Sequence, residues 1–149
     1  MHPFLSQTAV YALRAMAWLA ATSPAAPVRA RDLSEGSGIP AHYLSKILRR
    51  LVLARVLESQ KGHGGGFTLA RPPAEIFFMD VLAAVDAYPV PNRCAFGWGE
   101  CDTDHPCPLH EVFDRLGADY RKWASTTTFA DVRGFSPSDR RFPPSRISI

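Results

Sequence analysis

Residues 40–70, PAHYLSKILRRLVLARVLESQKGHGGGFTLA, decide the fold of this 149-residue chain. A helix with one buried stripe is predicted by apolar side chains at i, i+3, i+4 and i+7 spacing: Leu44, Ile47, Leu48 and Leu51. An apolar back and a cationic front are typical of the reading helix of a helix-turn-helix, although an ordinary amphipathic surface helix shows the same pattern. The residues of this helix that we expect to contact DNA are His42, Tyr43, Ser45, Lys46, Arg49 and Arg50.

The glycine-rich segment that follows favours the DNA-reading interpretation. Val56–Lys61 and Phe67–Ala70 are strand-like, and the turn between them reads GHGGG. A dinucleotide-binding loop is the competing interpretation, but it requires a helix after the glycines, and here a strand follows. A hairpin directly after a reading helix is a wing, whose glycines and tip can approach phosphates or a minor groove. The tip contacts are expected from Lys61, Gly62, His63 and Gly64.

Two helices are expected before the reading helix. Apolar residues at helical spacing predict the first over Ser6–Ala21, with Ser6 as its cap: Val10, Leu13, Ala17 and Ala20. A short second helix is expected over Ala30–Glu35. Gly36–Gly38 then forms the turn that leads into the reading helix.

Two further helices are expected after the wing. The first, over Met79–Ala87, is short and covers the core of the winged domain. The second, over residues 109–125, carries one apolar stripe that must be buried on its own domain or on a second copy of the chain. Because DNA readers of this kind usually work as two-fold dimers, we expect the second copy. The stripe comprises Leu109, Val112, Phe113, Leu116, Tyr120 and Trp123.

Charge is unevenly distributed along the chain. Residues 1–71 carry nine Lys or Arg against three acids, residues 72–132 four against ten, and residues 133–149 four against one. The formal net charge of +3 therefore hides a basic N-terminal half, which suits a polyanion such as DNA. The chain shows no secretory signal, and its longest apolar run is too short to cross a bilayer. These features predict a cytoplasmic protein with no membrane partner.

All three cysteines lie in residues 94–110, CAFGWGECDTDHPCPLH. In a reducing compartment, clustered cysteines indicate metal ligands or redox sensors rather than disulfides. Three thiolates and an imidazole suit an iron–sulfur cluster or zinc. The gaps between the cysteines are wider than in usual zinc knuckles, so we favour the cluster over zinc, a metal-free thiol sensor or unrelated buried cysteines. The predicted metal ligands are Cys94, Cys101, Cys107 and His110.

Other residues of this loop have predicted roles. Asp104, His105 or Glu111 could replace His110 as fourth ligand. The loop can wrap around one centre because Gly97 and Gly99 tolerate positive φ. Phe96 and Trp98 either shield the centre from solvent or simply pack against the protein.

The segments YALRAMAWLA (residues 11–20), IPAHYLSKILRRL (39–51) and KGHGGGFTLARPPAEI (61–76), followed by three cysteines, resemble the IscR-like, or Rrf-two, family of bacterial winged-helix transcription factors. The similarity spans residues 4–132. It implies a homodimer, palindromic operators, and a cluster near the dimer interface held by the three cysteines and His110. Nitric-oxide-sensing relatives can use a carboxylate from the partner's first helix, but Gln7–Val10 contains no acid. Lys61 replaces the usual wing arginine, and the family's base-reading positions match His42, Ser45 and Lys46.

The predicted fold is mainly α with a small β wing: a winged helix-turn-helix domain plus a long dimerisation helix. We assign residues 1–88 to the DNA-binding domain, 89–110 to a cysteine-rich cluster-binding loop, and 108–132 to the dimerisation helix and its cap. Residues 133–149, rich in proline, serine and arginine, are expected to be a disordered basic tail.

The predicted function is a DNA-binding transcriptional repressor whose operator affinity is switched by an iron–sulfur cluster that senses redox, nitric oxide or iron status. The expected partners are double-stranded palindromic DNA and a second copy of the chain. A 2Fe-2S cluster is favoured over a 4Fe-4S cluster. The main alternative is a cluster-free thiol regulator or a zinc-containing one, and a small redox protein is a weaker alternative. We expect no enzyme and no small-molecule substrate, since Cys-x-x-Cys and nucleotide-binding motifs are absent.

Overall fold

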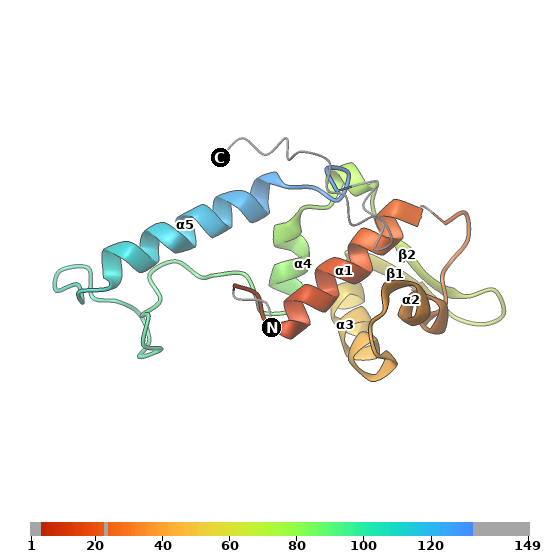
Figure 1. The fold of residues 1–149 in the computed structure, drawn as a ribbon, viewed down its shortest axis with the longest axis horizontal. Helices are drawn as coiled ribbons and strands as arrows, with labels where there is room; N and C mark the ends of the chain where they lie inside the picture. Colours follow the sequence, from red (N-terminus) through yellow and green to blue (C-terminus); the bar gives the residue numbers. More distant parts are fainter. Residues whose placement is uncertain (1–3, 23, 133–149) are drawn as a thin grey trace.

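The structure, a computed structural model, describes residues 4–22 and 24–132 and is mainly helical with one small sheet (Figure 1). This confirms the predicted fold class. The N-terminal part comprises α1 (Gln7–Thr22), α2 (Ala30–Ser37), α3 (Ala41–Leu53), β1 (Leu57–Gln60) and β2 (Gly66–Leu69). The C-terminal part comprises the short η1 (Pro73–Glu75), α4 (Phe78–Ala84) and α5 (His110–Thr126).

Helix α1 begins where predicted, but it buries a different face. The Ser6 side-chain oxygen accepts a hydrogen bond from the backbone N–H of Ala9 at 3.2 Å, which is the expected cap. Of the four predicted positions only Ala20 is buried; the buried residues of the helix are Ala9, Ala12, Ala15, Met16, Leu19 and Ala20. In an alanine-rich helix the apolar contrast between neighbouring faces is weak, so the sequence identified the helix but not its buried side.

The helix-turn-helix consists of α2 and α3, with a shorter turn than predicted. The residues Gly36 and Ser37 belong to α2, and the turn consists of Gly38, at φ +66°, Ile39 and Pro40. Gly36 has a packing role instead, since a Cβ there would collide with the Trp18 indole of α1. Helix α3 buries the predicted stripe completely. The reading helix is therefore held by its apolar back, and its cationic front is left exposed.

The wing is a two-stranded antiparallel hairpin in which Leu57 pairs with Leu69 and Gln60 with Gly66. Val28, in the segment between α1 and α2, adds an isolated bridge to Phe67 on the free side of β2. The glycines allow the backbone to make the hairpin turn. Gly62 and Gly64 have positive φ, and a Cβ at Gly65 would collide with the Gln60 carbonyl oxygen. The hairpin therefore explains the glycine run without any need for contact with phosphate.

The C-terminal half of α5 packs onto the winged domain through aromatic contacts. Phe78 of α4 meets Trp123 edge to face at a centroid distance of 5.4 Å and Phe129 at 4.7 Å. The backbone N–H of Phe78 also donates to the Thr127 carbonyl at 2.9 Å. These contacts attach the end of α5 firmly to α4, so the rest of α5 is held at a fixed direction.

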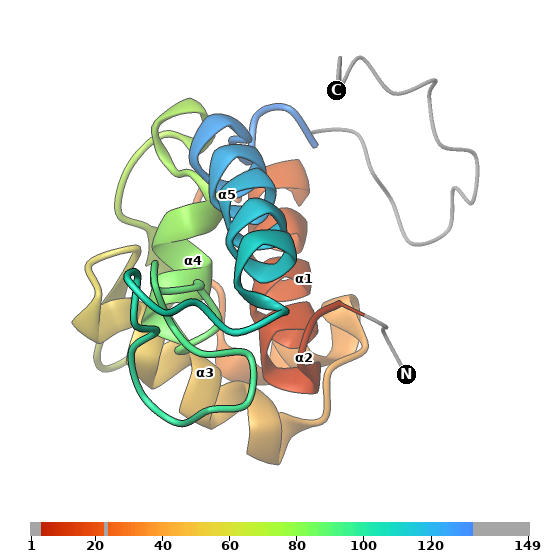
Figure 2. The ribbon, with the colours of Figure 1, turned by 90° about the vertical axis from the view of Figure 1, so that its left-hand side faces the viewer.

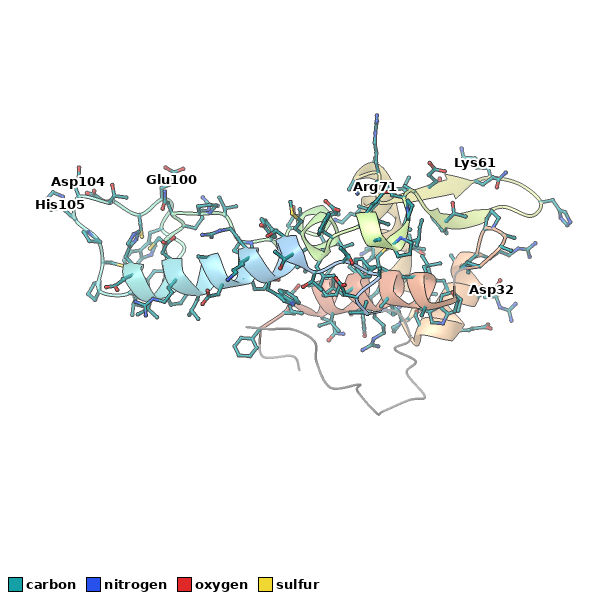
Figure 3. All side chains as sticks on the ribbon, turned by 90° about the horizontal axis from the view of Figure 1, so that it is seen from above. Asp32, Lys61, Arg71, Glu100, Asp104 and His105 are labelled. Atoms are coloured by element: carbon teal, nitrogen blue, oxygen red, sulfur yellow. The ribbon has the colours of Figure 1, made fainter. Side chains whose placement is uncertain are left out.

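The N-terminal half of α5 projects away from the winged domain (Figures 1 and 2). The cysteine loop lies at this projecting end, and the wing lies at the opposite end of the molecule (Figure 3). Among the described residues, no helix combines the length and the hydropathy needed to cross a bilayer. The predicted tail, residues 133–149, lies outside the described residues.

Candidate nucleic-acid interface and cysteine loop

The exposed front of α3 offers the predicted DNA-contacting residues to solvent. His42, Ser45, Lys46 and Arg49 are all exposed, and Tyr43 is 48% exposed. Neither Lys46 nor Arg49 has an ion-pair partner among the described residues. The Ser45 hydroxyl donates to the Ala41 carbonyl at 2.9 Å, so its oxygen is still able to accept. Two free cations one turn apart suit contacts with phosphates or guanine edges.

An aromatic cluster that the sequence analysis missed supports the start of α3. The ring of Tyr11, from α1, lies 5.7 Å from the ring of Tyr43, which in turn lies 4.2 Å from the His42 ring. The Arg14 guanidinium stands 5.5 Å from the Tyr11 ring centroid. The only available signal was the spacing of Tyr11 and Arg14 on one helix face. These contacts restrict the side chains of His42 and Tyr43 before any DNA is bound.

Arg50 differs from the other cations of α3 because it is already paired. Its guanidinium lies 3.0 Å from the carboxylate of Asp86, a residue that follows α4. The Arg50 side chain is 46% exposed and that of Asp86 is 82% exposed. An exposed pair of this kind contributes little to stability, about 0–1 kcal/mol. Arg50, one of the residues expected to contact DNA, is therefore weakly paired with an acid of its own chain.

The tip of the wing carries Lys61, Gly62, His63 and Gly64, all exposed. Lys61 has no ion-pair partner among the described residues and points outward at the far end of the molecule (Figure 3). A cation on a projecting hairpin can reach a phosphate or a minor groove beside the site read by α3.

The first part of the cysteine loop is a tight, irregular hairpin. Arg93 pairs with Glu100 in an isolated bridge, and the Cys101 N–H donates to the Asn92 carbonyl at 2.8 Å. The Cys94 N–H donates to the Gly99 carbonyl at 2.9 Å. Gly97 and Gly99 adopt φ of +75° and +101°, which confirms that glycine is needed for the loop to turn here. The hairpin brings Cys94 and Cys101 to neighbouring positions on its two sides.

The three thiols are half-buried and influence one another. Backbone N–H groups of Phe96 and Trp98 donate to the Cys94 sulfur and lower the pKa of that thiol; the Phe96 N–Sγ distance is 3.4 Å. Burial raises the pKa of Cys101, and the nearby Cys107 and Cys94 raise it further. N–H donors that stabilise a thiolate are also a feature of iron–sulfur sites.

His110 stands at the junction between the loop and α5. It is the first residue of α5, and its backbone N–H donates to the Cys107 carbonyl at 3.0 Å. Its half-buried side chain lines a cavity of about 510 Å³ together with Cys94 and residues from α5 and the N-terminal segment. His110 is thus in backbone contact with Cys107 and lines the same cavity as Cys94.

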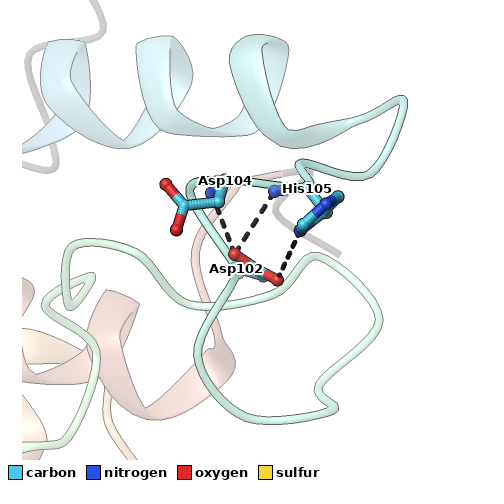
Figure 4. Close-up of polar contacts among 3 residues, drawn as sticks. All are labelled: Asp102, Asp104 and His105. Carbon is cyan, nitrogen blue, oxygen red and sulfur yellow. Dashed lines mark hydrogen bonds and ion pairs between the residues drawn. The ribbon is translucent and has the colours of Figure 1, made fainter.

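Two of the three other candidates for the fourth ligand, His105 and Glu111, have side-chain partners. The Asp102 carboxylate accepts hydrogen bonds from the N–H groups of Asp104, at 2.8 Å, and His105, and it contacts the His105 ring at 3.3 Å (Figure 4). The Asp104 and His105 N–H groups, in that order, lower the pKa of Asp102. Glu111 pairs with Arg115 at 2.8 Å. The side chains of His110 and Asp104 have no such partner among the described residues, so both remain candidates.

The donor set suits an iron–sulfur cluster or a single zinc ion. Three sulfur donors share one loop, and thiolates are the ligands that both zinc and iron–sulfur clusters prefer. Across the described residues, however, no three His, Cys, Asp or Glu side chains converge closely enough for one metal ion. An iron–sulfur cluster is also held by thiolates. Cys94, Cys101, Cys107 and His110 would hold it, and it would supply redox-sensitive iron.

Phe96 and Trp98 do not pack into the protein. Their rings stack at 5.0 Å with an interplanar angle of 22°, and they remain 54% and 82% exposed. Packing against the protein's own core, one of the two predicted roles, is therefore wrong for the single chain. The two rings instead contact each other in a largely exposed stacked pair.

The projecting half of α5 carries an exposed apolar stripe. Its members lie at i, i+3, i+4 and i+7 spacing and are 38–59% exposed: Leu109, Val112, Phe113 and Leu116. Farther along, Tyr120 and Trp123 are half-buried against the core, and the Tyr120 hydroxyl donates to the Ala87 carbonyl at 3.1 Å. The predicted stripe is thus divided, with its second half used within the chain and its first half left open.

The pKa difference between the cysteines predicts their order of reaction. In the reduced, metal-free protein at neutral pH, Cys94 should be alkylated by iodoacetamide before Cys101, because a lowered pKa gives more thiolate. The difference should shrink as the pH rises and Cys101 also ionises. Peptide mass spectrometry after timed quenching measures the order, and a urea-unfolded sample, where all three should react alike, is the control. Faster labelling of Cys101 would contradict the loop geometry.

Comparison with known proteins agrees with these features. A profile of the Rrf2 family, described as an iron-dependent transcriptional regulator, matches residues 5–133. The chain is 37% identical over 131 residues to the HTH-type transcriptional regulator Rv1287 of Mycobacterium tuberculosis, which covers 87% of this chain and 81% of that protein. It is 35% identical over 106 residues to the HTH-type transcriptional regulator IscR of Escherichia coli, which covers 71% of this chain and 65% of IscR.

A solved structure shows the same fold. CymR of Bacillus subtilis, described as its global cysteine regulator, superposes with a TM-score of 0.70 at 22% identity, over 86% of this chain and 94% of CymR. At that identity the similarity supports the fold alone. The profile and the curated relatives agree on transcriptional regulation, which is not an enzymatic activity.

Proposed function

Since this chain belongs to the Rrf2 family of DNA-binding transcriptional regulators, we propose that it is a homodimeric repressor whose operator affinity depends on an iron–sulfur cluster. The cluster would be held by Cys94, Cys101, Cys107 and His110, with a 2Fe-2S form favoured. The operator would be a palindrome in double-stranded DNA, and the site of action the cytoplasm. The signal would be redox state, nitric oxide or iron supply.

The DNA-binding part of the proposal is supported by the cationic front of α3 and the wing. Lys46 and Arg49 are exposed cations without ion-pair partners among the described residues. We assign base contacts to the first half of α3, His42 to Lys46, because residues near the start of a reading helix contact base edges. Arg49 is assigned to a base edge or a phosphate, and Arg50 and Lys61 are assigned to phosphates.

The dimer is supported by the open half of the α5 stripe. Four large apolar residues on one helix face, exposed in the single chain, form a surface that favours burial against another apolar surface. A two-fold dimer pairs the same stripe from each copy, so one stripe is sufficient. Two α3 helices would then face successive half-sites of a palindrome.

The observation that carries the switch is the direct continuity of the cysteine loop with this stripe. Cys107 contacts the first residue of α5 through its carbonyl, and Leu109 lies between them in sequence. A group that ties the three sulfurs together would fix the loop relative to the start of α5. The dimer geometry that fits the operator would then have one stability when the group is bound and another when it is absent. The free energy of DNA binding would differ between the two forms by the same amount, about 1–3 kcal/mol.

Two measurements on anaerobically purified protein test this proposal. Iron and acid-labile sulfide in equal amounts, with visible absorption, are expected; colourless protein with stoichiometric zinc would favour the zinc alternative. Selection of binding sites from a random duplex library should return a palindrome, and footprinting should protect two half-sites. Failure to enrich any sequence would contradict the assignment of α3 as a reading helix in this chain.

A further inference from the structure

The contact between Arg50 and Asp86 joins the DNA-reading helix to the segment that leads into the cysteine loop. Arg50 lies on α3 one turn after Lys46, so the two cations share a face. Asp86 follows α4 and begins the connector that reaches Cys94 eight residues later. The guanidinium–carboxylate distance is 3.0 Å. Among the described cations of α3, Arg50 is the one with an acidic partner.

The backbone holds Asp86 in place on both sides. Asp86 has φ of +57°, a conformation that non-glycine residues rarely adopt. Its N–H donates to the Ala83 carbonyl at 3.2 Å, and the next N–H, of Ala87, donates to Leu82 at 2.8 Å. The Ala87 carbonyl accepts the hydroxyl of Tyr120 on α5 at 3.1 Å. A short chain of contacts thus runs from α5 through Ala87 and Asp86 to Arg50.

We propose that Asp86 is a positioning residue that holds Arg50 away from DNA phosphates and links its release to the connector between α4 and the cysteine loop. This inference rests on the proposed function, and it identifies the contact through which the cysteine loop and α5 affect the DNA-reading helix. The ion pair is exposed, so a phosphate can displace the carboxylate at little cost. A shift of the connector that separates Asp86 from Arg50 frees a cation beside Lys46.

The geometry sets the choice of variant. Asp86→Asn removes the charge and keeps a side chain that tolerates positive φ, whereas alanine would add backbone strain. The probe is a mixed-sequence DNA duplex, because phosphate contacts do not depend on sequence. Binding is measured with the full-length protein over a series of salt concentrations, and circular dichroism verifies the fold of each variant.

Asp86→Asn is expected to tighten binding about two- to fivefold at moderate salt. If Arg50 gains a phosphate contact, the slope of log K against log salt should become steeper by about 0.9. In a protein that already carries Arg50→Gln, Asp86→Asn should leave the salt slope unchanged. The affinity should then rise only by the general effect of removing one negative charge from the protein. Glu75→Gln, which removes an exposed negative charge from η1, measures that general effect.

Several results would overturn the proposal. One is an Asp86→Asn protein that binds no more tightly than Glu75→Gln; another is an equal gain with and without Arg50. Weaker binding would mean that Asp86 aims Arg50 at the DNA rather than away from it.

As a second readout, Tyr120→Phe should also tighten binding if α5 holds Asp86 against Arg50, and an unchanged affinity would remove α5 from the link. If the wild type failed to bind any duplex, the proposed function itself would fail, which is a separate outcome.

Discussion

Leu116→Asp is expected to convert the proposed dimer into a monomer and to weaken operator binding by roughly 10²–10⁴-fold. Leu116 is 59% exposed in the open half of the α5 stripe. A carboxylate in the centre of a two-fold apolar interface would be desolvated and would face its own copy, which is strongly unfavourable. The loss in DNA binding follows because two linked reading helices gain affinity from effective concentration, and separate monomers do not. Analytical ultracentrifugation and operator binding measure the two effects.

Ala118→Asp is the matched control for this prediction. Ala118 is exposed on the opposite side of the same helix, two residues from Leu116, so the new charge meets only solvent. The variant should stay dimeric and bind the operator normally. If Leu116→Asp stayed dimeric, the interface would lie elsewhere, and the assignment of the stripe would be wrong.

Arg49→Ala is expected to weaken operator binding by 1–3 kcal/mol, roughly 5- to 150-fold, if its guanidinium forms a bidentate contact with a guanine. Arg49 is exposed on the front of α3 and has no ion-pair partner among the described residues, so the substitution removes no internal ion pair. Lys46→Ala should have a similar effect where Lys46 contacts a base. Fluorescence anisotropy with the selected operator and with a mixed-sequence duplex separates the two kinds of contact.

The operator and the mixed-sequence duplex distinguish a base contact of Arg49 from a phosphate contact. A lost base contact lowers operator affinity more than non-specific affinity, whereas a lost phosphate contact weakens both and makes the salt slope shallower by about 0.9. Arg115→Ala, on α5 at the projecting end, removes the same charge far from the wing and should leave both affinities nearly unchanged. Unchanged operator binding by Arg49→Ala would remove this residue from the interface.

The sequence predicted those elements whose apolar pattern has strong contrast. In α3, leucine and isoleucine alternate with charged residues, so both the helix and its buried face were predicted correctly. In α1 the buried and half-exposed faces both contain alanine, and of the four predicted positions only Ala20 is buried. The predicted wing was also correct, since turn glycines and strand residues are local signals.

Contacts between distant segments could not be predicted in this way. Arg50 meets Asp86, and Tyr11 meets Tyr43, only because α4 and α1 pack against α3. No local pattern specifies such a meeting. The division of the α5 stripe is similar: its period predicts one face, but only the position of Phe78 decides that Trp123 is buried and Leu116 is not.

The cysteine loop shows the same division between local and tertiary information. Its glycines predicted the turns, and the residue types predicted a sulfur-rich site. The commitment of Asp102 to backbone N–H groups, and of Glu111 to Arg115, depends on the folded loop. His105 and Glu111 therefore already have side-chain partners in the folded loop, whereas His110 and Asp104 have none among the described residues.

The central claim is that the state of the sulfur-bound centre sets operator affinity. Its most direct test is the operator affinity of one anaerobic preparation before and after removal of the centre, with a protein carrying serine at positions 94, 101 and 107 measured beside it. We predict about a 5- to 150-fold change on removal and no change in the serine protein. Equal affinities in all three samples, with the dimer intact, would contradict the claim and leave only a constitutive DNA-binding protein.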